Sequence, residues 1–273
     1  TFNLGGQAQV TTDAADNGCN VWLISGHNTA AAITQDLTVD TCTFNLNGNN
    51  TNTAAAGAGG SLNIGEADTT SDNSDVFGDV FLFSTTVNAI GGSSAFAAGG
   101  TGGNVNIEIR DDAALAKGNV VVSSACVFNL NGGGNLGAGS TDVGDGGNLS
   151  IRDTGFNDGQ SDGGNVIFYG TVITDGGDVD SRGSDISGGI AGNVSMVSGE
   201  DIVIGTTGGT TTICTNGGSS SIPGGFGNGA QGGNAGDILI RMDVDIQANT
   251  SGNVANDDGA FILASGSALI AHG

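Results

Sequence analysis

Short runs of alternating apolar and polar residues recur along the chain, and glycine, asparagine, aspartate or serine bound each run. One run has the pattern Gly-Gly-Asn-Val-x-Ile, as at residues 102–107. A second has the pattern Thr-Phe-Asn-Leu-Asn-Gly, as at residues 43–48. Alternation over four to six residues predicts β-strands that bury one face. We therefore expect an all-β protein.

Both patterns return at a nearly constant interval. Copies of the first lie at residues 18–23, 59–64, 102–107, 146–151, 191–196 and 232–240, and their second residues are separated by 41, 43, 44, 45 and 41 positions. Copies of the second lie at residues 1–6, 43–48, 86–91, 127–132, 171–176, 212–217 and 267–273. Their apolar second residues are separated by 42, 43, 41, 44, 41 and 55 positions. A fixed period of this size predicts a stack of one repeated structural unit.

A further apolar run lies between these two patterns in each unit. Its copies are residues 36–39, 79–83, 119–122, 165–168, 201–204 and 260–263. Three short strands and a glycine-rich loop per unit predict a parallel β-helix, or β-solenoid, of about six coils of roughly 43 residues. We expect one domain over residues 1–273. It comprises a lone third strand with a lead-in loop (1–17), five regular coils (18–231) and a final coil with a longer insertion (232–273).

Stacked coils place equivalent residues about 4.8 Å apart. We expect an inward apolar column that includes Phe2, Phe44 and Phe128. The head of the first strand supplies a second column, and side-chain amides in such a column can hydrogen-bond along the stack. Its predicted members are Asn20, Asn104, Asn148, Asn193 and Asn234. The glycines before them are expected to provide left-handed or tight backbone at a sharp corner.

The chain is strongly acidic, with 28 aspartate and glutamate residues, five lysine and arginine residues, and a formal net charge of −23. This charge argues against nucleic acid as a partner, because a phosphate backbone needs a basic surface. No apolar run is long enough to predict a membrane span. The chain begins at Thr1, which fits a processed, exported protein and equally a trimmed one. We expect an extracellular or cell-surface location.

The acidic residues can be interpreted in two ways. Calcium takes six to eight oxygen ligands, and two loops hold carboxylates at close spacing. The candidate calcium ligands are Asp72, Asp75 and Asp79 in one loop, and Asp175, Asp178, Asp180 and Asp185 in the other. The alternative is that these carboxylates are solvated and promote solubility. No other cofactor is predicted.

Catalytic patterns are not evident. The two histidines, His27 and His272, lie outside any motif, and no carboxylate pair is singled out for glycoside hydrolysis. Cys42 and Cys126 occupy the same slot two coils apart, roughly 9–10 Å, which exceeds the reach of a disulfide. A Cys19–Cys42 bridge within one coil stays open as an alternative. We expect a protein that is not an enzyme.

The Gly-Gly-Asn-Val-x-Ile repeat with its glycine-, serine- and threonine-rich corners resembles repeats of filamentous-haemagglutinin-like bacterial exoproteins. The resemblance covers residues 18 to about 273 and implies a secreted right-handed β-helix that serves as an adhesin or surface fibre. The leading expectation is a structural subunit of an extracellular filament, sheath or surface fibre that assembles end to end with copies of itself through uncapped strand edges. The alternative is an adhesin or binding module, a fragment of a longer secreted β-helix protein, that contacts carbohydrate or a cell surface. A polysaccharide-degrading β-helix enzyme is the third possibility.

Overall fold

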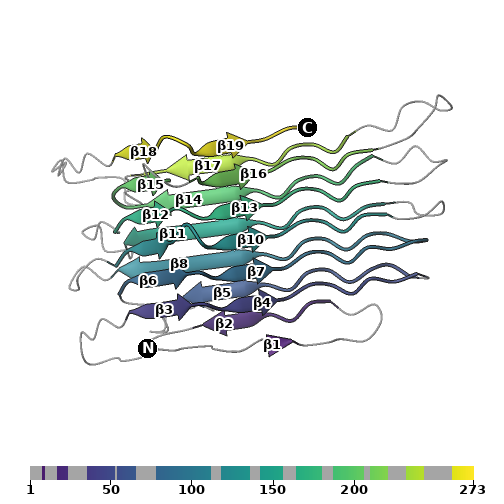
Figure 1. The fold of residues 1–273 in the computed structure, drawn as a ribbon, viewed down its shortest axis with the longest axis horizontal. Helices are drawn as coiled ribbons and strands as arrows, with labels where there is room; N and C mark the ends of the chain where they lie inside the picture. The colour runs from purple at the N-terminus through teal and green to yellow at the C-terminus, as the bar shows by residue number, and fades with distance from the viewer. Residues whose placement is uncertain are drawn as a thin grey trace, which may run out of the picture.

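The computed structural model describes residues 8–9, 17–23, 36–52, 54–65, 78–111, 118–135, 142–155, 164–179, 187–205, 210–220, 232–242 and 260–273. Within these residues the chain forms three parallel β-sheets and contains no helix (Figure 1). Strands from successive units lie beside one another in each sheet, in the order of the sequence. The predicted parallel β-helix is therefore confirmed.

Among the described residues, two of the three sheets contain six strands each and the third contains seven. Sheet B contains β2 (Val21–Leu23), β5 (Leu62–Gly65), β8 (Val105–Asp111), β11 (Leu149–Gly155), β14 (Val194–Ser198) and β17 (Ile238–Arg241). Sheet C contains β3 (Leu37–Asp40), β6 (Val80–Phe83), β9 (Val120–Val122), β12 (Val166–Phe168), β15 (Ile202–Ile204) and β18 (Phe261–Leu263). Sheet A contains β1 (Ala8–Gln9), β4 (Thr43–Asn45), β7 (Thr86–Asn88), β10 (Val127–Asn129), β13 (Thr171–Ile173), β16 (Thr212–Cys214) and β19 (Ala268–Ile270). Each coil follows the order B, C, A.

Alternation along each strand directs apolar side chains into the space between the sheets. In β10, Phe128 points inward and is fully buried, while Asn129 is half-buried on the outer side. Phe128 stacks between Val87 and Val172 of the neighbouring coils. Columns of this kind form one continuous core through the coils, which stabilises the stack by removing apolar area from water.

Two details of the predicted stacking are wrong, and both lie at the ends. Phe2 lies outside the described residues, and the slot beside Phe44 is occupied by Ala8 of β1. In the last coil, Leu269 rather than Ala268 pairs with Ile213. The final step is therefore one residue longer than predicted. A shift of one residue turns every side chain of a strand to the opposite face, so this register places Leu269 in the inward column.

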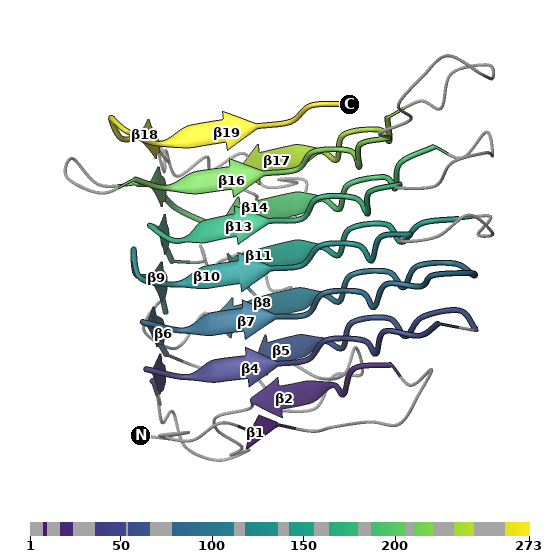
Figure 2. The same ribbon diagram turned by 45° about the vertical axis from the view of Figure 1, so that its right-hand side comes forward.

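A second structural region projects from the β-helix between the end of each sheet A strand and the next sheet B strand (Figure 2). We call it the glycine arm. Its described segments are 46–52 with 54–61, 89–104, 130–135 with 142–148, 174–179 with 187–193, and 215–220 with 232–237. Each arm has an outgoing and a returning segment, and backbone hydrogen bonds join both to the arms of neighbouring coils. Gly133 N, for example, donates to Gly100 O of the preceding arm at 2.8 Å, whereas Gly144 N donates to Gly133 O at 2.9 Å and joins the two segments of one arm.

Inward-facing glycines recur every third residue in the returning segment, as at Gly100 and Gly103 or Gly144 and Gly147. This spacing matches the three-residue turn of a polyproline II chain, in which glycine permits close lateral packing. A Cβ atom on Gly147 would lie 1.8 Å from the carbonyl oxygen of Gly103 in the preceding coil. The interior of the arm is therefore largely backbone packed against backbone.

This packing corrects the predicted role of the glycines that precede sheet B. None of the pairs Gly59–Gly60, Gly102–Gly103 and Gly146–Gly147 has a positive φ. Among the described glycines, positive φ values occur elsewhere, as at Gly65, the last residue of β5, and at Gly205 after β15. The paired glycines are required because neighbouring coils approach too closely for a side chain, rather than because the backbone is left-handed.

Candidate assembly surface and the side-chain ladders

The predicted asparagine column is present over most of its length, as a ladder between coils. Asn148 donates from its backbone N and from Nδ2 to Asn104 Oδ1, at 2.9 and 3.0 Å. Asn193 N then donates to Asn148 Oδ1 at 2.8 Å. At the start of the stack, Ser61 N donates to Asn20 Oδ1 at 2.9 Å. The ladder thus joins successive coils by side chain-to-backbone bonds.

The last position of this ladder differs from the prediction. Asp237, not Asn234, lies beside Asn193, and its backbone N donates to Asn193 Oδ1 at 2.7 Å. Asn234 instead accepts a backbone hydrogen bond from Ala191 at 2.9 Å, one turn earlier in the arm. In the last coil, the residue equivalent to Gly192 is therefore Gly236 rather than Gly233.

A second ladder precedes the strands of sheet C and includes one of the predicted calcium ligands. Asn119 donates from its backbone N and from Nδ2 to Asp79 Oδ1, at 2.8 and 2.9 Å. Asp79 N donates to Asp36 Oδ1 at 3.1 Å. The ladder continues through Asn165 and Asp201, and ends with Ala260 N donating to Asp201 Oδ1 at 2.7 Å.

Two other predicted calcium ligands occupy equivalent positions on the glycine arm. Asn216 N donates to Asp175 Oδ1 at 2.8 Å. Ser219 donates to Asp178 Oδ1 from both N and Oγ, at 2.8 Å each. Each carboxylate thus binds the next coil through its Oδ1. The remaining candidates, Asp72, Asp75, Asp180 and Asp185, lie outside the described residues. Within the described ranges, no three His, Cys, Asp or Glu side chains gather as a metal site would require.

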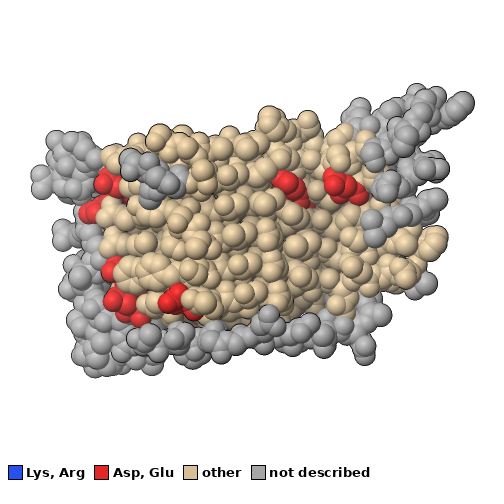
Figure 3. All heavy atoms as spheres, in the orientation of Figure 1, with Lys and Arg blue, Asp and Glu red and all other residues tan. Residues whose placement is uncertain are grey.

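All these ladders share one direction. In every case a side-chain oxygen accepts from the backbone N–H of the following coil, so the acceptors face the C-terminal end of the stack. A surface carboxylate in such a position satisfies a backbone donor of its neighbour. On the face in Figure 3, acidic side chains lie near the left edge and, right of centre, on the face itself, while much of the rest of this face carries no charge.

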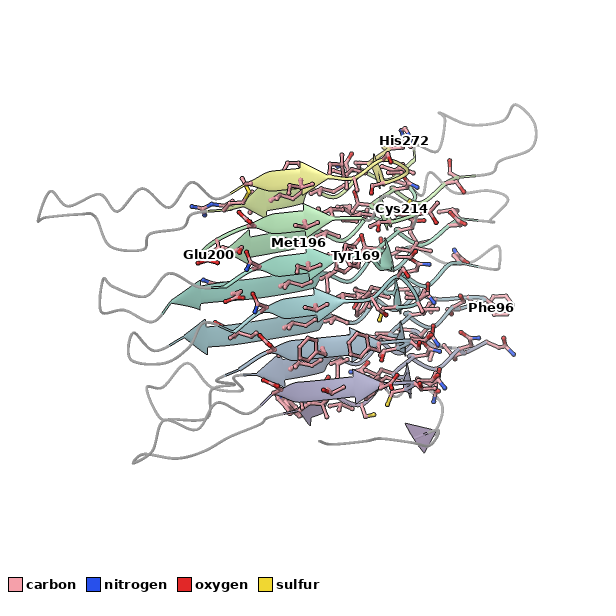
Figure 4. The ribbon with its side chains drawn as sticks, turned by 60° about the vertical axis from the view of Figure 1, so that its left-hand side comes forward. Phe96, Tyr169, Met196, Glu200, Cys214 and His272 are labelled. Carbon is pink, nitrogen blue, oxygen red and sulfur yellow. The ribbon has the colours of Figure 1, made fainter. Side chains whose placement is uncertain are left out.

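The four cysteines are free thiols. Cys42 and Cys126 are buried in the core, as their slot predicts, and the alternative of a Cys19–Cys42 bridge is not realised. Cys214 lies on the outer side of sheet A near the C-terminal end (Figure 4). Partial burial and the negative charge of Asp175 raise the pKa of the Cys214 thiol, although the nearby Asn216 amide lowers it in part. The thiol is therefore held in its protonated, unreactive form.

The histidines form no catalytic arrangement within the described residues. His272 is exposed, and its backbone N donates to Asn216 Oδ1 at 3.1 Å as the last rung of an arm ladder. His27 lies outside the described residues. The described part of the chain also holds no helix with the length and hydrophobicity of a membrane span.

From β6 to β18 the outer face of sheet C is apolar, a feature that the sequence analysis did not identify. Phe81, Val121, Ile167 and Val203 form a half-buried row along it, and Ile262 continues the row. The composition of these strands could have predicted this apolar face. Their sequences are continuous apolar runs, which are typical of strands buried on both faces.

The two ends of the stack differ in exposure. In the first coil, the inward residues Leu37 and Val39 are only 3–4% exposed, and Phe44, which lies beside Ala8 of β1, is 5% exposed. In the last coil, Phe261, Leu263 and Leu269 occupy equivalent slots and are 37–46% exposed. The C-terminal end thus presents strand edges and apolar side chains together. Exposed apolar surface beside open strand edges is typical of an assembly surface.

Comparison of the chain with protein-family models, with curated proteins and with solved structures finds no match.

Proposed function

We propose that this protein is a structural subunit of an extracellular fibre or surface stalk. The observation that carries the proposal is the use of its polar residues. Asp79, Asp175 and Asp178, the described residues that most resembled ligands, instead hold adjacent coils together through their Oδ1 atoms. A chain that commits its carboxylates to such ladders is suited to form a stiff, regular rod.

The shape supports the same role. Sheets of six or seven parallel strands in register, together with the stacked glycine arms, give a body that extends one repeat at a time. Addition of coils lengthens such a body without altering its cross-section. The exposed C-terminal edge supplies a surface for contact with more β-structure.

Immunogold labelling of the native cells tests this proposal. We expect the label to follow fibres or stalks outside the cell. Label confined to the cell interior, or spread evenly through the medium as monomer, would contradict the proposal.

An adhesin that contacts carbohydrate is a second candidate, and one residue favours it. Phe96 lies at the tip of a glycine arm (Figure 4) and is 62% exposed. Exposed aromatic rings suit stacking on sugar rings. Sedimentation with insoluble cellulose or chitin tests this candidate, with Phe96→Ala as the matched variant. Equal retention of the two proteins would remove the reason for it.

A further inference from the structure

Two glycine columns in the arm show what each end of the stack can contact. The first contains Gly60, Gly103, Gly147, Gly192 and Gly236, and the second contains Gly92, Gly133, Gly177 and Gly218. At every one of these positions, an added Cβ would lie 1.8–2.2 Å from a carbonyl oxygen of the preceding coil. Real Cβ atoms do not approach oxygen so closely. Each coil must therefore have glycine here in order to stack on the coil before it.

The first coil breaks this rule in both columns. The residue in the preceding slot of the first column is Cys19, whose carbonyl oxygen lies 2.0 Å from the Cβ position of Gly60. In the second column it is Asn49, whose carbonyl oxygen lies 2.1 Å from the Cβ position of Gly92. Because the columns are regular, the Cβ atoms of Cys19 and Asn49 point toward the N-terminal end. They occupy the space that the carbonyl groups of an underlying coil would need.

The C-terminal end has the opposite character. The last described members are Gly236 in the first column and Gly218 in the second, and the regularity of the columns directs their carbonyl oxygens toward the C-terminal end. In each earlier pair of coils, the N–H of the first residue in a sheet B or sheet C strand donates to the next coil, and so does the N–H of the residue that follows a sheet A strand. Val194 N donates to Asp237 O, Ile202 N to Ala260 O and Thr215 N to Ile270 O. The equivalent donors of the last coil are Ile238, Phe261 and Ala271. They lie at the same end as the exposed apolar residues.

We propose that the C-terminal end binds one more parallel β-helix coil that carries glycine in both columns, and that the first full coil of a second copy is excluded from this role by Cys19 and Asn49. This inference rests on the proposed structural function and specifies its direction. The partner is recognised by its glycines, by carbonyl groups that receive the three donors, and by a backbone N–H opposite the Asp237 carboxylate, which continues the ladder.

A fusion that supplies such a coil tests the proposal. Gly273 occupies the slot of Gly217 and Gly176, so a second copy of residues 177–217 appended after Gly273 continues the pattern in phase. The appended coil contains Gly177 and Gly192, one from each column. The matched control is the same fusion with both appended glycines changed to alanine. The wild-type chain is the reference.

Hydrogen exchange gives the readout at single amides. In the glycine fusion, we expect the Ile238, Phe261 and Ala271 amides to exchange at least about tenfold more slowly than in the wild type. Binding of a dye for exposed apolar surface should fall in parallel. The alanine fusion should retain the wild-type rates at these amides. The Val194 amide is already bonded in the wild type and should not change in either fusion.

Three results would overturn the proposal. One is an unprotected C-terminal edge in the glycine fusion, and another is equal protection in the alanine fusion. The third is concentration-dependent protection of the same amides in the wild type, which would show that a second copy does stack there. None of these results moves immunogold label from the cell surface. Failure of this inference is therefore distinguishable from failure of the proposed function.

Discussion

Gly147→Ala gives the most direct test of the glycine arm. Gly147 lies in the middle of the stack, and its new Cβ would lie 1.8 Å from Gly103 O, against an ordinary contact of 3.4 Å or more. The neighbouring backbones must separate by about 1.6 Å, roughly a third of the spacing between coils. No flexible side chain is available to move aside, because the nearest atoms are all backbone.

The expected loss of stability has two parts. Overpacking of a close-packed interior costs about 1–3 kcal/mol. The separation also weakens two backbone hydrogen bonds between these coils, from Gly102 N to Asp145 O at 2.8 Å and from Val105 N to Asn148 O at 2.9 Å. At about 0.5–1.5 kcal/mol each, the total is about 2–6 kcal/mol. That is a large share of the free energy of unfolding of a typical domain.

The matched control is Gly232→Ala, since the nearest atom to its Cβ position is 3.6 Å away and its φ is not positive. This change should be neutral, or stabilising by up to about 1 kcal/mol. Urea unfolding followed by circular dichroism measures both variants, with comparison restricted to variants whose m value is unchanged. If Gly147→Ala and Gly232→Ala differ by less than about 0.5 kcal/mol, the close-packing argument is refuted.

Three further predictions concern the ladders, the thiol and the exposed end. Asp79→Ala should lower the free energy of unfolding by about 1–3 kcal/mol, because Asn119 N and Nδ2 lose their acceptor. Asp79→Asn should change it little. Thermal melts that rank the two variants equally would contradict the ladder role. Asp175→Asn should speed alkylation of Cys214 by iodoacetamide at pH 8, because loss of the neighbouring negative charge lowers the thiol pKa and increases the thiolate fraction. Mass spectrometry of the Cys214 peptide measures this, and an unchanged rate would show that Asp175 does not act on the thiol. Leu239→Lys, at a residue 46% exposed, should reduce binding of an apolar dye with less than about 0.5 kcal/mol change in stability; dye binding at the wild-type level would place the apolar surface elsewhere.

The three-strand coil was predictable from the sequence because two independent patterns keep the same period. Alternation then determined which residues face inward, as Phe128 and Asn129 show. The phase of the last coil was not predictable from the motif alone. Residues 232–234 repeat the Gly-Gly-Asn pattern, and Gly236-Asp237 offers an equally suitable start. Only the bond from Asp237 N to Asn193 decides between them.

The role of the glycines was harder to predict, because tight turns and close packing both favour glycine. The distinguishing cue was spacing. Pairs such as Gly57 and Gly60, or Gly189 and Gly192, are three residues apart in successive units. Likewise, Asp79 resembled a metal ligand by composition. Its position directly before a sheet C strand, shared with Asn119 and Asn165, was the sign of a ladder.

The stacking of short parallel strands also determines how the rod responds to load. A force along the stack axis acts on the hydrogen bonds between neighbouring coils. The coils therefore separate one pair after another instead of all together. Each coil that detaches releases roughly 43 residues, or about 140–155 Å of extended chain. A fibre made in this way is stiff under bending and compression, yet extends by many times its length before any covalent bond is loaded. Such behaviour suits a tether that must survive sudden pulls without breaking.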